Sequence, residues 1–358
     1  MKRVFNIGAL CLVACMLCGC GGIGPGTVMH DRFDYTETIA QSWKQQMLIN
    51  MVKLRYGDTP VFLDVASVIN QYSIETQADL RLTWFEPQIT VGNSQSTGGS
   101  AKYTDKPTIT YTPLNGERFA RSMMKPLPPP AILSLIQGGY PIDLVLRMCV
   151  HSINGVRNRY GGAARARPAD PEFYPILQRM RKMQDSGALG LRVEKTGEME
   201  GVVMTFRGKV SPELDEDVVF VRKALGLDLN AREFRVAYGS IAKDDKEIAM
   251  LSRSMLEIII DTASCIDVPA EHVQNKLTIA TMPPEKLGDA EVPPLIRILS
   301  ADRKPGESFI AVPYRNHWYY IDDRDLRSKS LFTFLMFAFS LTETEGREGA
   351  PIVTIPAG

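Results

Sequence analysis

Three cysteines lie within six residues near the start of the chain, in the stretch CMLCGC, and thiols this close could bind a metal or exchange a disulfide. Cys15 and Cys18 have the Cys-x-x-Cys spacing of a zinc half-site or a redox pair. A zinc site needs two more ligands on a folded frame. A c-type haem needs a histidine directly after the second cysteine, where this chain has Gly19. We therefore expect neither a metal nor a redox site here.

Four side chains of the stretch HWYYIDDRDLRSK could in principle bind a divalent cation: His317, Asp322, Asp323 and Asp325. Their spacing does not match a calcium-binding EF-hand loop, and no glycine supplies the turn of such a loop. We instead expect Asp322 and Asp323 to end a strand and Asp325 to cap the following helix.

The remaining histidines, His30, His151 and His272, lie far apart and in no ligand motif. The chain also has no His-Glu-x-x-His, no Gly-x-Ser-x-Gly and no phosphate-binding loop motif. The sequence therefore assigns no catalytic residue, no metal site and no cofactor.

Four arginines concentrate charge in the Gly- and Ala-rich stretch RNRYGGAARARPADP: Arg157, Arg159, Arg165 and Arg167. Guanidinium groups could contact an anion such as a lipid headgroup phosphate, or an acidic partner. The alternative, which we favour, is a solvated linker closed by Pro168 and Pro171.

Residues 1–19 have the pattern of a secretory signal peptide. Lys2 and Arg3 precede an apolar run, Val4–Leu17, that is too short to span a bilayer. The sequence Leu17-Cys18-Gly19-Cys20 then resembles the lipobox of bacterial lipoproteins, although Ala or Ser is more usual than cysteine at position 18. The resemblance implies cleavage before Cys20 and a diacylglycerol on its thiol. Residues 20–33 would follow as a flexible tether.

Two cysteines remain besides the acylated one, Cys149 and Cys265. An exported chain permits a disulfide between them, but each lies in an apolar stretch where a lone cysteine is typically a small core residue. Cleavage leaves 39 basic and 41 acidic residues, a net charge of −2. This balance excludes a general nucleic-acid binder, which would have a basic excess.

The chain has the element pattern of an α+β protein: antiparallel β segments with several packed helices and a long amphipathic helix near the N-terminus. That helix is predicted to begin at Asp34, with Glu37 completing the capping-box spacing, and to end at Gly57. Residues 140–159 and 246–266 are predicted as two further long helices. A boundary in the arginine-rich stretch predicts two domains, 34–160 and 171–358.

Residues 61–113 are rich in strand-forming side chains, and Ala78, Leu80, Leu82 and Trp84 alternate with polar ones. We expect an antiparallel hairpin or meander with a polar, glycine-rich turn over 93–106. A soluble sheet is the simpler interpretation. A subunit of an oligomeric pore built from this segment is the sharper alternative.

Three phrases of the chain resemble an uncharacterised family of proteobacterial lipoproteins: SWKQQMLINMVKLRYGDTPVFLDVASVINQY, PTITYTPLNGERFARSMM and HWYYIDDRDLRSKSLFTFLMFAFSL. The resemblance covers most of the mature chain. It implies an exported, acylated protein with this order of helix, strands and helices, and it supplies no activity or catalytic residues.

The leading hypothesis is a membrane-anchored, non-catalytic interaction or assembly module with a protein partner in the cell envelope. Gly21, not aspartate, follows the acylated cysteine. In the sorting pattern of enteric lipoproteins this favours the outer membrane, with the folded part on its periplasmic or surface side. The alternatives are an envelope hydrolase acting on glycan or peptide, and the oligomeric pore subunit.

Overall fold

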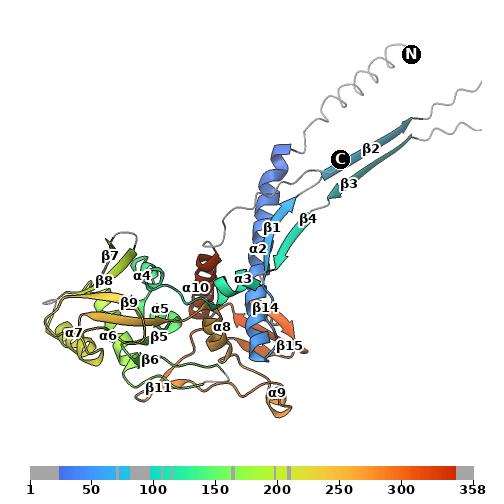
Figure 1. The fold of residues 1–358 in the computed structure, drawn as a ribbon. Coiled ribbons are helices and arrows are strands. Elements are labelled where there is room, and N and C mark those ends of the chain that lie inside the picture. The colour runs from blue at the N-terminus through green and yellow to red at the C-terminus, as the bar shows by residue number, and fades with distance from the viewer. Residues whose placement is uncertain are drawn as a thin grey trace, which may run out of the picture. The chain divides into compact units, whose positions relative to one another are not determined.

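The computed structural model of the 358-residue chain describes residues 24–69, 72–80, 97–105, 108–113, 116–162, 166–196, 199–207 and 211–343 (Figure 1). The predicted signal peptide and Cys20 lie outside these residues. The chain divides into two units, which we call the body, residues 1–60 and 116–358, and the ribbon, residues 61–115. The fold is α+β, as the sequence predicts.

The helices of the body are α2 Gly24–Arg55, α3 Gly116–Phe119, η1 Ala120–Met124, α4 Pro129–Gln137, α5 Ile142–Cys149, α6 Phe173–Asp185, α7 Pro212–Ala224, α8 Met255–Ala263, α9 Ala270–Gln274 and α10 Leu326–Glu343. Its strands are β5 Val150–Ile153, β6 Val156–Arg157, β7 Leu189–Thr196, β8 Met199–Phe206, β9 Glu233–Tyr238, β10 Glu247–Ser252, β11 Glu285–Leu287, β12 Ala290–Val292, β13 Leu299–Ala301, β14 Ser308–Tyr314 and β15 His317–Asp322. Among the helices that the structure describes, none has the length and apolar composition needed to cross a bilayer.

Helix α2 begins ten residues earlier than the sequence predicts. It starts at Gly24, so Asp34 lies inside the helix rather than at its N-cap, and residues 24–33 are helix rather than loose tether. Pro25 stands in the first turn, where a proline is favourable because its missing N–H would have no helical partner. Gly57 follows the helix with a φ of +74°, the left-handed conformation that commonly ends helices, and this confirms the predicted end.

The C-terminal part of α2 belongs to the core. Met47, Leu48, Met51 and Val52 are buried, where the helix packs on β14, β15 and α8. Upstream, residues 36–46 are exposed or half-buried, and Trp43 is 36% exposed. The amphipathic helix predicted from the sequence is therefore buried in the core over residues 47–52. At 1.5 Å per residue, the preceding part of α2 is about 35 Å long.

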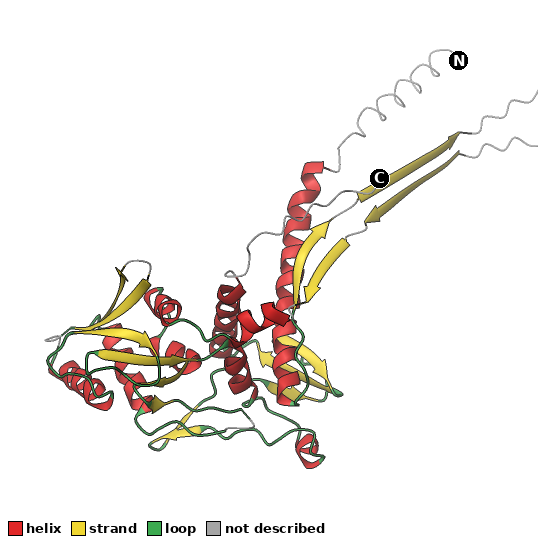
Figure 2. Cartoon of the chain, viewed as in Figure 1, coloured by secondary structure: helices red, strands yellow, loops and turns green. Residues whose placement is uncertain are grey.

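A six-stranded sheet organises one half of the body, in the strand order β6-β5-β10-β9-β8-β7. Neighbouring strands are antiparallel except β9 and β10, which run parallel. Helices lie alongside this sheet (Figure 2): α4 contacts β7, β8 and β9, α5 contacts β5, and α6 contacts β7 and α7.

Strands from both sides of the arginine-rich stretch share this sheet, because β5 and β6 precede residues 161–170 and β7–β10 follow them. The expected boundary there does not separate two units. The division that the structure shows isolates residues 61–115 instead.

Two stretches predicted as single helices each contain a strand. Residues 140–159 form α5 and then β5 and β6, and residues 246–266 form β10 and then α8. β10 is central in the sheet and buried almost throughout. It therefore lacks the alternation of apolar and polar residues that marks a half-buried strand, and its apolar run resembles that of a buried helix. A capping box then starts α8: Glu257 N–H donates to Ser254 Oγ at 3.3 Å, and Ser254 N–H donates to Glu257 Oε2 at 2.9 Å.

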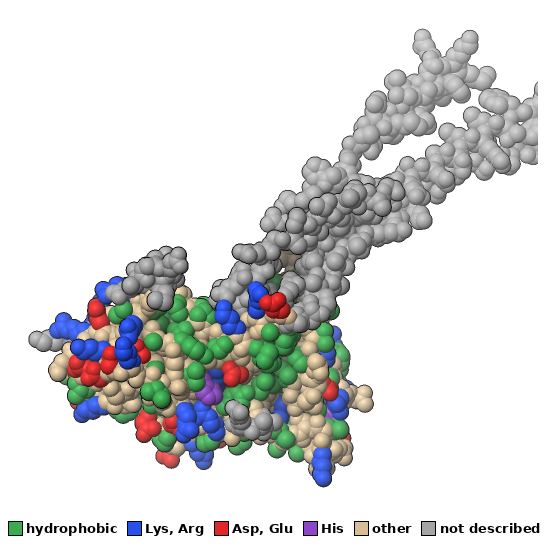
Figure 3. Space-filling model, viewed as in Figure 1, with side chains coloured by type: hydrophobic (Ala, Val, Ile, Leu, Met, Phe, Trp, Pro, Cys, Tyr) green, Lys and Arg blue, Asp and Glu red, His purple; other side chains and the backbone are tan. Residues whose placement is uncertain are grey.

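A smaller antiparallel sheet, in the order β13-β15-β14, supports α2 on the other side of the body. Helix α10 follows β15 and contributes these buried apolar side chains to the core: Leu331, Phe332, Phe334, Leu335 and Ala338. Acidic and basic side chains are intermixed on the face of the body drawn in Figure 3, as expected from their equal numbers in the sequence.

The ribbon is built from two antiparallel ladders. β1 (Leu63–Ile69) pairs with β4 (Thr108–Pro113), and β2 (Tyr72–Leu80) pairs with β3 (Thr97–Asp105), with Tyr72 opposite Asp105 and Leu80 opposite Thr97. This confirms the antiparallel arrangement expected for 61–113. The turn expected over 93–106 is wrong, because residues 97–105 form β3. Gly98 and Gly99 are poor strand formers, but pairing with β2 outweighs that local preference.

Candidate functional site

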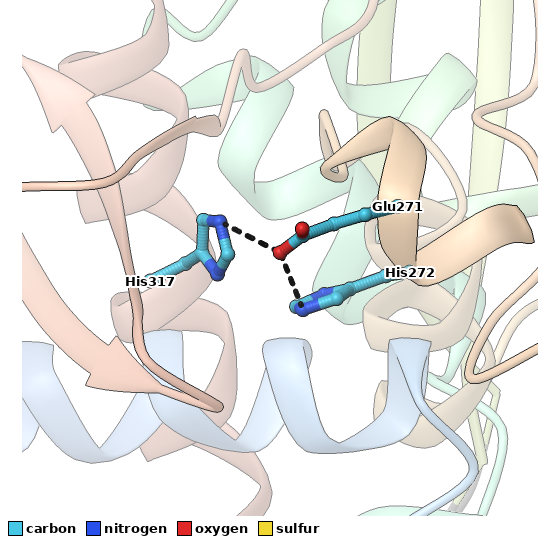
Figure 4. A group of neighbouring side chains, drawn as sticks. All are labelled: Glu271, His272 and His317. Carbon is cyan, nitrogen blue, oxygen red and sulfur yellow. Dashed lines mark ion pairs between the residues drawn. The ribbon is translucent and has the colours of Figure 1, made fainter. Parts of the chain in front are cut away.

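Two histidines and a glutamate from distant parts of the sequence meet between α9 and β15 (Figure 4). Glu271 and His272 belong to α9, and His317 is the first residue of β15. Oε1 of Glu271 lies 3.5 Å from Nε2 of His317 and 3.8 Å from Nε2 of His272. One ligand atom from each residue lies within 4.8 Å of the other two. We call Glu271, His272 and His317 the histidine cluster.

The cluster has a buried side and an open side. His272 is 5% exposed, whereas the Glu271 side chain is 63% exposed. Asp302, directly after β13, adds a second carboxylate on the open side. Its Oδ1 lies 3.2 Å from Nε2 of His317, and its side chain is 92% exposed.

The second ring nitrogen of each histidine has its own partner. Nδ1 of His272 lies 2.6 Å from the Tyr56 hydroxyl, which hydrogen-bonds to the Tyr319 hydroxyl. Nδ1 of His317 donates to the carbonyl of Arg315 at 3.2 Å. Both rings are thereby oriented with Nε2 toward the glutamate. Burial lowers the pKa of His272, and the neighbouring imidazole of His317 lowers it further, which favours a neutral ring.

A cavity of about 550 Å3 opens beside Tyr56, between the end of α2, helix α8 and residues 273–280. Its lining is mostly apolar, including Leu54, Ile260 and Leu277. Arg55 lies at its wall and donates to the carbonyl of Ile279 at 2.8 Å. This lining offers apolar contact to a ligand, and Ser264, Lys276 and Thr278 add polar groups to it.

The sequence grouped His317 with three aspartates, and the structure separates them. Asp325 caps α10 as predicted, because its two carboxylate oxygens accept from Ser328 N–H at 3.0 Å and from Ser328 Oγ at 2.7 Å. Asp322 accepts from Arg324 N–H at 2.8 Å, and Asp323 pairs with Lys329 at 2.7 Å. The three aspartates therefore have structural roles. His317, at the other end of β15, lies beside Glu271 and His272 of α9.

No sequence motif predicts the histidine cluster. Glu271 and His272 stand 45 or more residues before His317, in a five-residue helix that was not predicted. Metal motifs recognised from sequence rely on ligands spaced along one helix or loop. The only available signal was the adjacent pair Glu271-His272, which is too short to be specific.

The sequence predicts Arg159 at the surface, in a solvated linker or as a contact for an anion, but it lies in the interior. It is 4% exposed, and its Nε lies 3.7 Å from Oδ1 of Asp261. Asp261 also accepts from Arg253 Nη1 at 3.1 Å and from Gly161 N–H at 2.7 Å. A β-carbon on Gly161 would lie 1.9 Å from Ser264 Oγ, so only glycine permits this approach. The surface prediction is wrong for Arg159, because a buried carboxylate already binds it.

The other arginines of that stretch do not form one group. Arg157 is exposed and pairs with Asp170 at 3.3 Å, and Arg167 lies 3.2 Å from Nε2 of His151. Arg165 lies outside the described residues. An anion site made of all four is therefore not found among the residues that the structure places.

Both remaining cysteines are free thiols, so the disulfide between Cys149 and Cys265 that we had allowed is not formed. Cys149 is buried, and this burial raises the pKa of its thiol to about 12. Cys265 is half-buried, and its Sγ accepts from Arg159 Nη2 at 2.9 Å. Cys149 thus fits the predicted role of a small core residue.

Searches of protein-family models, of curated proteins and of solved structures found no match to the chain. The functional inference therefore rests on the residues and the geometry described above.

Proposed function

We propose that the chain is a lipid-anchored protein of the bacterial cell envelope that acts as a non-catalytic assembly module, in which the ribbon joins one copy of the chain to the next. The observation that carries the proposal is the β2–β3 ladder, nine paired residues long and two strands wide. In the described part of the ribbon, each of these strands pairs with one neighbour only.

A two-stranded ladder is at best marginally stable alone in water. It also presents a row of unpaired backbone N–H and C=O groups along each outer edge, and such edges pair readily with further strands. Among its described residues, the β2–β3 ladder has two such edges, so the β3 edge of one copy can pair with the β2 edge of the next. Repeated head-to-tail contacts of this kind close into a ring when the rotation between copies permits it.

The anchor part of the proposal rests on the sequence around Cys20 and on helix α2. The charged start, the short apolar run and the lipobox-like Leu17–Cys20 all point to acylation of Cys20. The N-terminal part of α2, residues 24–46, then supplies a helical spacer of about 35 Å between the anchor and the core of the body. Gly21 favours the outer membrane as the location.

A shortened ribbon tests the assembly role. Ile69 and Thr108 are the last paired residues of the β1–β4 ladder, so residues 70–107 can be replaced by Asn-Gly, which forms a two-residue hairpin turn. Two differently tagged copies of the full chain should co-purify from detergent extracts. The shortened chain should not co-purify with a full-length copy. Co-purification that is undiminished by the deletion would sink the assembly role.

Replacement of the acylated cysteine tests the anchor separately. Cys20→Ala should move the protein from the membrane fraction to the soluble fraction of cells, because it removes the thiol that carries the lipid. Cys265→Ala is the matched control and should leave the protein in the membrane fraction. An unchanged membrane association of Cys20→Ala would contradict the anchor.

A pore subunit is a second candidate, favoured by the length of the ladder. Nine residues per strand is the length that tilted strands need to cross the apolar part of a bilayer. Addition of the purified full chain to dye-loaded lipid vesicles should release the dye if copies insert. The chain with residues 70–107 replaced by Asn-Gly should release none.

A further inference from the structure

We infer that the histidine cluster is a binding site for a transition metal ion of the zinc type, with Glu271, His272 and His317 as ligands and Asp302 as the fourth. This inference is independent of the ribbon and of the lipid anchor. It rests on the convergence of one ligand atom each from Glu271, His272 and His317, with the Asp302 carboxylate beside His317, on the partners of the two other ring nitrogens and on the charge of the site.

The distances between neighbouring ligand atoms suit a tetrahedral ion. A tetrahedron with metal–ligand bonds near 2.1 Å has ligand atoms about 3.4 Å apart. The pairs around the glutamate and the exposed aspartate measure 3.5 Å, 3.8 Å and 3.2 Å. The ligand atoms of Glu271, His272 and His317 all lie within 4.8 Å of one another, so these three residues can share one ion, and the exposed Asp302 lies beside His317 as the fourth ligand.

The hydrogen bonds of the histidine rings expose lone pairs to the site. A carbonyl can only accept, so Nδ1 of His317 carries the proton that it donates to Arg315. A neutral ring then presents the Nε2 lone pair to Glu271 and Asp302. Three acceptors would face one another there, an arrangement that only a cation, either a proton on Nε2 or a metal ion, makes favourable.

His272 is oriented in the same manner by two tyrosines. When the Tyr56 hydroxyl donates to Tyr319, it accepts from Nδ1 of His272, and Nε2 again becomes a lone-pair ligand. Burial raises the pKa of both tyrosines and keeps them protonated. Metal-ligating histidines typically have such a partner on the second nitrogen, which fixes both the tautomer and the ring orientation.

The ligand types select the class of metal. Two imidazoles with carboxylates suit zinc and its neighbours in the first transition series, whereas calcium and magnesium prefer oxygen ligands alone. A bound ion would connect α9, β15 and the residue after β13. It would also neutralise the two carboxylates on the open side of the cluster.

The test uses the full chain in detergent, without a polyhistidine tag, stripped of metal by a chelator and then titrated with ZnCl2 in a calorimeter. We expect one Zn2+ per chain. We also expect a melting temperature raised by roughly 5 °C when free Zn2+ is a hundredfold above Kd. Co2+ in place of Zn2+ should give the strong visible absorption of a four-coordinate ion.

Three variants give the test its specificity. His317→Gln should weaken the affinity at least a hundredfold, and Asp302→Asn about tenfold. Glu307→Gln changes another exposed carboxylate, one paired with Arg324, and should leave binding unchanged. If His317→Gln fails to fold, the Zn2+ affinity of Asp302→Asn still tests the inference. Asp302 is highly exposed, so its replacement does not disturb the core.

Two results would overturn the inference. One is the absence of saturable binding of Zn2+ by the wild-type chain, which would leave a proton on His317 as the cation of the site. The other is equal affinity in the wild type and in Asp302→Asn, together with undiminished affinity in any folded His317→Gln protein.

Discussion

The body and the ribbon differ in how fully their strands and polar groups are paired. In the body, central strands have neighbours on both sides, and even the buried Asp261 is matched by Arg253, Arg159 and a backbone N–H. In the ribbon, the described strands β2 and β3 have one neighbour each. This difference suggests a division in which the body stabilises the fold and the ribbon carries the proposed assembly role. The predictions below test that division, from the largest expected effect on stability to the smallest.

The largest effect is expected from Asp261→Asn in the body. The substitution leaves two buried guanidinium groups without their carboxylate, and loss of one partner of a buried ion pair typically costs about 3–5 kcal/mol of unfolding free energy. Denaturant unfolding followed by circular dichroism measures this loss. Asp185→Asn removes an exposed ion pair with Arg181 and serves as the control, with a change below about 0.5 kcal/mol. Similar changes in the two variants would show that Asp261 does not stabilise the interior.

A smaller effect is expected at the start of α8. Ser254→Ala removes the serine hydroxyl of the capping box and should cost about 1 kcal/mol, because the N–H of Glu257 loses its acceptor. The same unfolding experiment measures it. Ser240→Ala, at an exposed bend, should be neutral, and an equal loss in both variants would argue against the cap.

Asp325 should make the stability of the body depend on pH in the acid range. Burial alone would raise the pKa of Asp325, but hydrogen bonds from Ser328, together with Arg297 and Arg327, hold this pKa below its ordinary value. The carboxylate therefore stabilises the fold fully above about pH 4, and this contribution is lost as pH falls through the lowered pKa of the folded state.

Thermal unfolding at a series of pH values checks this prediction. Asp325→Asn should lower the melting temperature at pH 7 and should flatten its decline below pH 4. Asp170, whose pKa the pairing with Arg157 also lowers, is unchanged in that variant and keeps part of the decline. A wild-type curve with no acid decline would contradict the assignment.

Removal of residues 70–107 of the ribbon should have the smallest effect on the stability of the body. Replacement of residues 70–107 by Asn-Gly deletes β2 and β3 but changes no residue of the body. We expect the melting temperature of the helical signal to change by less than about 2 °C, which corresponds to less than roughly 0.5 kcal/mol. A large decrease would mean that the ribbon stabilises the body, and the division between the two regions would be wrong.

The predictions from the sequence were correct where residues close together in the sequence determine the local structure. Gly57 ended α2, Asp325 capped α10, and the antiparallel character of residues 61–113 followed from their strand-forming side chains. In each case the residues concerned lie within a few positions of one another or form one continuous strand-rich segment, so their preferences are readable in a short window.

The predictions from the sequence were wrong where residues distant in the sequence determine the structure. β10 lies between β5 and β9, and this burial removed the periodicity that identifies a strand. β3 contains glycines that favour a turn, and β2 holds them in a ladder. The histidine cluster needs α9 and β15 in contact, which no window of sequence contains. Arg159 appeared solvated because its partner Asp261 lies 102 residues later.

The central claim, assembly through the ribbon, is tested most directly by the mass of the particle in detergent. Light scattering, with the detergent contribution subtracted, should give a mass several times that of one chain for the full protein and the mass of a single chain for the protein with residues 70–107 replaced by Asn-Gly. A single-chain mass for the full protein, or the same multiple for both, would contradict the account.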